Sequence, residues 1–205
     1  MNFEAKVEKL IDMASIEKWL ADNSVMGDNS KINNFNDRNI ISYIPPTRLW
    51  SKAVNMNYFV KTCTRLKEIQ GLDITSATSA QEMIRDANTL HTCILENTGN
   101  VTNWYGFGHG AAALKVLKTL DMTSATNTYN MLPSSVLETL LFVPNTLKVS
   151  LTIKSAVLSN ESIQSIVDGI AYNETAQTLT LNTAVVEKLT AEQMTTISNK
   201  NWSVG

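Results

Sequence analysis

The sequence predicts an α/β fold in which short strands and turns repeat every 24 residues as a short solenoid, preceded by a helix and closed by a mixed α/β cap. Three observations predict it. Apolar and small residues recur at a step of 24 through the middle of the chain, residues 1–22 carry a helical apolar pattern, and the period breaks after residue 146. We therefore divide the chain into an N-terminal helix and linker (1–30), a solenoid (31–146) and a C-terminal strand–helix–strand cap (147–205).

The repeat consists of slots that keep their size and polarity from unit to unit. The matching slots are a large apolar series (Phe59, Met83, Phe107, Met131), a small series (Cys63, Ala87, Ala111, Ser135) and a strand series (Leu66, Leu90, Leu114, with Leu137 one residue early). Each unit is expected to hold a short extended segment and one short helical turn anchored by the Phe or Met. One unit cannot bury its apolar face alone, whereas stacked units share a core. Glu96 falls in the slot of Leu72 and Leu120, so we expect that unit to be distorted locally.

The first unit carries a more specific pattern. It reads Asn55-Met56-x-x-Phe59-x-x-x-Cys63-x-x-Leu66-x-x-Ile69 and continues into residues 72–78, which are nearly repeated at 120–126. This pattern resembles the BspA-type leucine-rich repeat, which occurs in bacterial surface proteins and in proteins encoded by phages of gut Bacteroidetes. The later units replace the Cys by Ala or Ser and are degenerate. The resemblance implies a leucine-rich-repeat-like solenoid with an extended binding face.

The C-terminal cap is expected to close the open end of the stack, which would otherwise expose core and unpaired strand edges. Either Ser159 or Asn160 is the N-cap of its first helix. The expected elements are a strand over 147–153, a helix over 159–170, a strand over 178–181, a helix over 187–200 entered at 190–193, and a strand over 202–204. The segments 179–182, 188–190 and 200–202 resemble the tails of phage-encoded members of the same family.

The N-terminal segment is a candidate docking helix. Its apolar residues lie mostly on one broad face, and its end is marked by a polar stretch from residue 22 to residue 30. The residues expected to make contact are Phe3, Val7, Leu10, Ile11, Trp19 and Leu20. This helix either caps the first repeat or packs against another chain, so a homo-oligomer is expected.

Several functional classes are disfavoured by composition. The net charge is −2 with no basic stripe, so no nucleic acid is expected as a partner. No apolar stretch reaches the roughly 18 residues of a membrane span. The first residues lack the pattern of a secretory signal, so we read the chain as complete from Met1 and made in the cytoplasm.

No constellation of residues indicates catalysis. His91 and His109 are expected at the surface without ligand partners, and Cys63 and Cys93 are expected as buried, inert thiols. The glycine-rich stretch 106–110 lacks the preceding strand and the following Lys-Ser/Thr of a phosphate loop. We therefore expect no catalytic residue, no cofactor and no metal, and a protein that is not an enzyme.

The outward strand slots are the candidate interaction face. Ile94, Leu95, Leu141 and Phe142 are expected to form an apolar patch there, unless irregular units turn some of them inward. Trp104 and Tyr105 are contact candidates on the opposite face.

The function expected from the resemblance is a phage virion component, such as a fibre, decoration or tail-associated protein, located in the particle. Its partners would be other virion proteins or a protein or glycan of the host surface. The alternatives are a bacterial cell-surface adhesin of the same repeat type and an intracellular protein-binding module. A structural spacer that binds nothing through its repeat face is compatible with the same residues.

Overall fold

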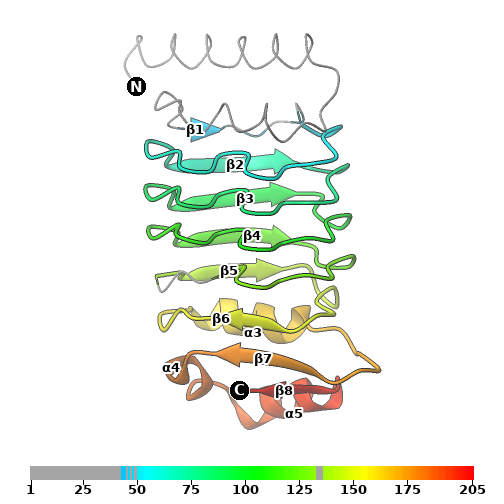
Figure 1. Cartoon of the computed structure of the whole chain (residues 1–205). Helices are drawn as coiled ribbons and strands as arrows, with labels where there is room; N and C mark the ends of the chain where they lie inside the picture. The colour runs from blue at the N-terminus through cyan, green and yellow to red at the C-terminus, as the bar shows by residue number, and fades with distance from the viewer. Residues whose placement is uncertain (1–42, 45, 47, 49, 133–135) are drawn as a thin grey trace.

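The computed structural model describes residues 43, 44, 46, 48, 50–132 and 136–205, and this part of the chain is α/β with parallel sheets and few helices (Figure 1). The first sheet has the order β1-β2-β3-β4-β5 and the second the order β6-β7-β8. The first contains β1 (Tyr43–Ile44), β2 (Glu68–Asp73), β3 (Thr92–Glu96), β4 (Val116–Leu120) and β5 (Thr139–Phe142). The second contains β6 (Leu151–Ile153), β7 (Gln177–Leu181) and β8 (Trp202–Val204), and the helices are α3 (Asn160–Gly169), α4 (Thr183–Val186) and α5 (Ala191–Asn199). The predicted docking helix, with Phe3, Val7, Leu10, Ile11, Trp19 and Leu20, lies outside the described residues.

The strand register follows the 24-residue step. Ile69 pairs with Cys93, Cys93 pairs with Leu117, and Leu117 pairs with Leu140 one residue early. Each layer of the chain therefore lies directly on the next, as the stacked arrows of Figure 1 show. The members of the described slots are all buried. They are Phe59, Met83, Phe107 and Met131; Cys63, Ala87 and Ala111; and Leu66, Leu90, Leu114 and Leu137.

The segments opposite the first sheet are consecutive β-turns, so the prediction of a helical turn in each unit is wrong. Phe59 N–H donates to Met56 O at 3.3 Å and Cys63 N–H donates to Val60 O at 3.2 Å, while Tyr58 has a φ of 59°. A positive φ at the third position is the mark of a type II turn and breaks an α-helix. The next two layers repeat it at the same slots, where Gly106 with a φ of 58° supplies it without steric strain.

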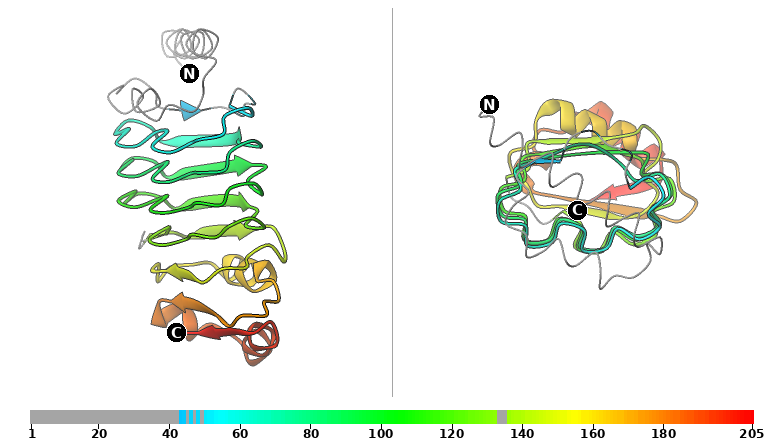
Figure 2. Two further views of the ribbon diagram at one scale, coloured as in Figure 1. Left: turned by 45° about the vertical axis from the view of Figure 1, so that its right-hand side comes forward. Right: turned by 90° about the horizontal axis from the view of Figure 1, so that it is seen from above.

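These turns are bonded from layer to layer instead of along the chain. Tyr58 N–H donates to Gln81 O at 3.0 Å, Glu82 N–H donates to Tyr105 O at 2.9 Å, and Gly106 N–H donates to Tyr129 O at 2.9 Å. The backbone amides that a helix would have used internally therefore join one layer to the next. Viewed from above, the layers superimpose closely (Figure 2). We call this side of the molecule the turn face.

The expected distortion near Glu96 is real, but it differs from the prediction. Leu72 pairs with Leu95 because β2 carries an additional residue, Gly71, whose φ is 73°. Leu95 therefore enters the core and Glu96 is exposed. Asn97 follows β3 with a φ of 56°, and the 24-residue spacing is restored by the bridge between Ser79 and Asn103. A β-bulge thus moved the inward position by one residue.

The C-terminal segment changes sides relative to the layers above it. Helix α3 packs against β5 on the side of the first sheet, whereas β6, β7 and β8 follow the turn face (Figure 2). The bridge between Leu132 and Ile153 joins β6 to the last turn segment. Ser159, one of the two residues predicted for this position, is the N-cap of α3. Helix α5 begins at Ala191, within the predicted entry at 190–193, and Thr190 and Gln193 form a capping box there. The strand predicted over 147–153 begins only at Leu151, and α4 was not predicted.

Among the described residues, no helix is both long enough and apolar enough to span a membrane.

Candidate functional site

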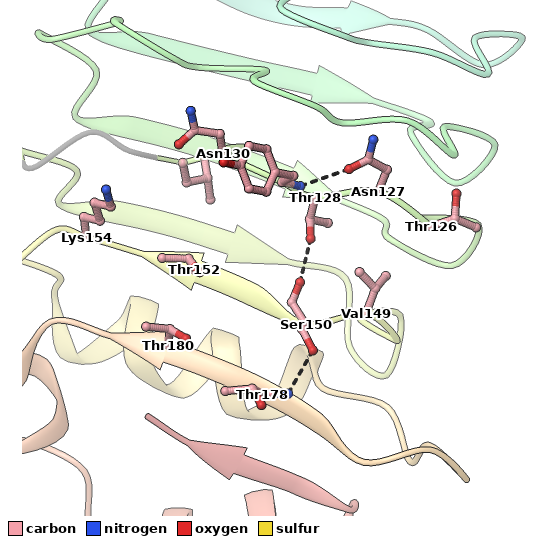
Figure 3. Close-up of a pocket in the computed structure, with 12 residues that line it drawn as sticks. Thr126, Asn127, Thr128, Asn130, Val149, Ser150, Thr152, Lys154, Thr178 and Thr180 are labelled. Carbon is pink, nitrogen blue, oxygen red and sulfur yellow. Dashed lines mark hydrogen bonds between the residues drawn. The ribbon is translucent and has the colours of Figure 1, made fainter.

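A groove of about 510 Å³ opens on the turn face, where the last turn segment meets β6 and β7 (Figure 3). Its roof comes from residues 126–130 and Leu132, and its floor from the outward residues of the second sheet. Along β6 and β7 the buried residues alternate with exposed threonines, so hydroxyls rather than apolar side chains face the groove. The lining consists of Thr126, Asn127, Thr128, Tyr129, Asn130, Leu132, Val149, Ser150, Thr152, Lys154, Thr178 and Thr180.

The groove exists because the layer-to-layer bonding of the turn face is interrupted there. In the layer above, the N–H groups of Trp104, Gly106 and Gly108 donate to the carbonyls of residues 127, 129 and 131. By the same geometry, the N–H groups of Thr128 and Asn130 are directed toward the next layer. Within the described part of the chain no backbone carbonyl accepts from either of them. The roof therefore presents backbone donors.

One end of the groove is held by a chain of hydrogen bonds. Thr128 Oγ1 donates to Ser150 O at 2.5 Å, and Thr178 N–H donates to Ser150 Oγ at 3.0 Å (Figure 3). The N–H and the hydroxyl of Ser150 donate to Gln177 Oε1 at 2.8 and 2.9 Å. These contacts fix the spacing between roof and floor before any ligand arrives.

An aromatic pair stands at the roof. The rings of Tyr105 and Tyr129 are stacked with centroids 5.8 Å apart and an interplanar angle of 17°. Tyr129 is 70% exposed, which leaves the ring face that is turned away from Tyr105 open to solvent. Asn127 fixes the turn, since its Oδ1 accepts from Tyr129 N–H at 3.1 Å while its amide donates at 3.1 Å to Asn103 Oδ1 in the layer above. The ring is therefore carried by a rigid turn.

The predicted apolar patch on the strand face is not formed. Leu95 and Phe142 are 0% and 6% exposed, because each lies two residues after a buried residue of its own strand, Cys93 or Leu140, and so points to the same face. Ile94 and Leu141 are half-buried on the outer surface, and Ile94 pairs with Lys118 of the intervening strand. A charged side chain thus interrupts what was expected to be a continuous apolar surface.

Of the two contact candidates predicted on the turn face, one is buried and one is exposed. Trp104 is fully buried against Phe107, with its ring N–H donated to Val101 O at 3.2 Å, so it is a core residue and the prediction that it makes contacts at the surface is wrong. Tyr105 is 36% exposed and belongs to the aromatic pair beside the groove. The groove itself was not predicted. Tyr105 and Tyr129 lie 24 residues apart, and this repeated exposed aromatic was the signal that could have located it.

Residues with catalytic chemistry are not gathered in the described part of the chain. No group of three potential metal ligands was found there. Burial raises the pKa of the Cys63 thiol to about 12 and raises that of Cys93 as well, so both stay protonated at neutral pH. His109 is partly buried rather than exposed as predicted, and its Nδ1 has no hydrogen-bond partner among the described residues.

The strongest electrostatic feature of the turn face is a buried carboxylate. Glu82 is 8% exposed, and its Oε2 lies 2.9 Å from Lys61 Nζ and 2.8 Å from Arg85 Nη1. Burial alone would raise the pKa of Glu82, but the hydrogen bonds and charges of the two cations outweigh it, so the pKa lies below its ordinary value of 4.5.

This ion triad predicts a dependence of stability on pH. A lowered pKa in the folded state stabilises the fold fully above about pH 4.5, and the contribution is lost as the pH falls through the lower folded value. We expect the free energy of unfolding, measured with urea between pH 7 and pH 3, to fall less steeply in Glu82→Gln than in the wild type. Glu138→Gln removes a carboxylate that is paired with Lys115 but half exposed, and is the matched control. Equal slopes for the wild type and Glu82→Gln would contradict the prediction.

Comparison of the chain with protein-family models, curated proteins and solved structures gives no match.

Proposed function

We propose that the chain is a short leucine-rich-repeat-like solenoid that acts as a non-enzymatic binding protein, and that it is a component of a phage virion. The observation that carries the binding role is the groove on the turn face, whose roof and floor are fixed by the protein's own hydrogen bonds. A site that is already formed loses little conformational freedom when a partner binds. The 24-residue register and the buried slots support the solenoid.

The virion role rests on the resemblance of residues 55–78 and of the C-terminal segment to phage-encoded BspA-type repeat proteins. In this role the N-terminal segment attaches the protein to the particle, as a homo-oligomer or by docking on another virion protein. The turn face then meets a neighbouring protein or the host surface. A bacterial adhesin of the same repeat type, or an intracellular protein-binding module, would use the same groove without a particle.

Mass spectrometry of gradient-purified phage particles from the source culture tests the virion role. We expect the protein at a fixed copy number relative to the major capsid protein, and that number separates a capsid decoration from a single tail structure. Absence from the particles, together with recovery from the host cytoplasm or envelope, would contradict it.

A further inference from the structure

We propose that the groove beneath residues 126–130 binds a neutral oligosaccharide, with one sugar ring stacked on Tyr129. This inference rests on the proposed binding function and names its ligand. Three features of the groove select the ligand: backbone donors along the roof, an open aromatic face at the roof, and a lining without carboxylates.

The roof selects a ligand rich in oxygen acceptors. The carbonyls of residues 127 and 129 already accept from the layer above, and Thr128 O accepts from Met131 N–H within its own turn. The N–H groups of Thr128 and Asn130 are directed toward the groove and have no backbone acceptor among the described residues. Thr126 O adds one acceptor at the end of this row, because it occupies the position at which Thr102 O accepts from Thr126 N–H in the layer above. The hydroxyl and ring oxygens of a sugar can accept from these N–H groups.

The floor supplies groups that both donate and accept. Thr152 and Thr180 are neighbours in the parallel pairing of β6 and β7, and both are exposed beneath the roof (Figure 3). A hydroxyl can reverse its direction to suit its partner, and so can meet the mixed donor and acceptor pattern of sugar hydroxyls. Asn130 at the roof adds an amide with both functions.

Tyr129 gives the site its stacking surface. One face of its ring is occupied by Tyr105, and the side chain as a whole is 70% exposed. The apolar C–H face of a pyranose can lie on such a ring and exclude water from it, while the hydroxyls at the rim of the sugar reach the threonines. The stack on Tyr105 holds the ring in place, so little side-chain freedom is lost on binding.

The charge of the lining favours a neutral ligand. Among the residues that line the groove, Lys154 is the single charged side chain. One exposed cation provides little for a polyanion such as a nucleic acid, whose binding requires several phosphate contacts. The lining likewise offers no carboxylate to pair with a basic peptide.

The test uses the surface polysaccharides of the bacterium in the source culture, hydrolysed to oligosaccharides and separated by ion exchange into neutral and acidic fractions, and titrated into the full chain by calorimetry. We expect the neutral fraction to bind, and Tyr129→Ala to weaken binding about tenfold or more. Tyr172→Ala removes a tyrosine that is 67% exposed outside the groove, and should leave affinity unchanged. Thr180→Glu places a charge on the floor without touching the core, and should also abolish binding.

Three results would overturn the proposal: no binding of the neutral fraction at about 1 mM, binding that Tyr129→Ala and Thr180→Glu leave unchanged, or binding of the acidic fraction alone that Lys154→Met removes. The outcome is separable from the virion role. A protein present in particles that binds no oligosaccharide contradicts this inference alone, whereas oligosaccharide binding by a protein absent from particles contradicts the virion role alone.

Discussion

Replacing Phe107 with alanine is expected to lower the free energy of unfolding by about 3–5 kcal/mol. Phe107 is fully buried in the large apolar slot that Met83 and Met131 occupy in the adjacent layers, and its ring meets Trp104 edge-on with centroids 5.2 Å apart. The truncation removes apolar area and an aromatic contact in one step. The cavity cannot collapse easily, because the backbone on both sides is bonded to the layer below through Gly106 and Gly108.

Urea unfolding followed by circular dichroism measures this loss. Tyr129→Ala is the matched control, because it truncates an aromatic residue that is 70% exposed in the next layer. Apart from the loss of the stack on Tyr105, it should change the free energy of unfolding by no more than about 0.5 kcal/mol. Phe107→Leu keeps most of the volume and should lie between the two. A loss below about 1 kcal/mol for Phe107→Ala would show that the large slot is not a packed core position.

The inward side of the fold was predictable because it repeats. A residue such as Phe107 is recognised by the apolar residues 24 positions before and after it, and burial follows from that recurrence. Leu95 was predicted on the wrong face of the sheet because a fixed repeat length does not reveal a β-bulge. Gly71 lengthens β2 by one residue and moves its inward position to Leu72, whereas β3 alternates regularly from Cys93 to Leu95. A glycine within a strand, directly before a register mismatch, was the available signal.

The helical turns were wrong for a related reason. A large apolar residue with a small residue four positions later, as in Phe59 and Cys63, is common to a helix and to two consecutive turns. The layers decide between them, because amides that donate to the next layer are not free to close a helical turn. The 24-residue period therefore identified which residues are buried, but it could not identify which backbone groups are hydrogen-bonded to one another.

The 24-residue period could not predict the groove, because the groove forms where the period ends. Its roof belongs to the last regular layer, and its floor belongs to β6 and β7, which lie on the turn face after residue 150. The exchange of sides places α3 under β5 and leaves the turn face with fewer layer-to-layer bonds. The repeated turns define the shape of the roof, and the end of the repeat leaves the groove below that roof.

The same exchange creates the edge on which the second large effect depends. Strand β5 is the last strand of its sheet. The backbone N–H groups on its free edge would lack acceptors if a helix packed there without hydrogen-bonding to them. Ser162 is fully buried in α3, and its hydroxyl accepts from Leu140 N–H at 2.9 Å while donating to Glu138 O at 3.0 Å. Ser165 Oγ accepts from Phe142 N–H at 2.9 Å. Two hydroxyls thus take the place of a further strand.

Replacing Ser162 and Ser165 together with alanine is expected to lower the free energy of unfolding by about 1–3 kcal/mol for each hydroxyl removed, because each leaves a strand amide without its acceptor. Ser162→Ala should have the larger effect, since this hydroxyl is fully buried and serves two backbone groups. Ser198→Ala in α5 replaces an exposed serine and is the control for a change in helix propensity alone.

Amide hydrogen exchange distinguishes a lost edge contact from a general loss of stability. In the double variant the amides of Leu140 and Phe142 should exchange faster than those of Cys93 and Leu117, which pair within the interior of the same sheet. Light scattering should also detect association between molecules, because an unsatisfied parallel edge is a template for pairing. Unchanged protection at Leu140 and Phe142 would mean that α3 covers β5 by packing alone. The apolar contacts of α3, including the close approach of Gly169 to Phe142, would then suffice to end the sheet.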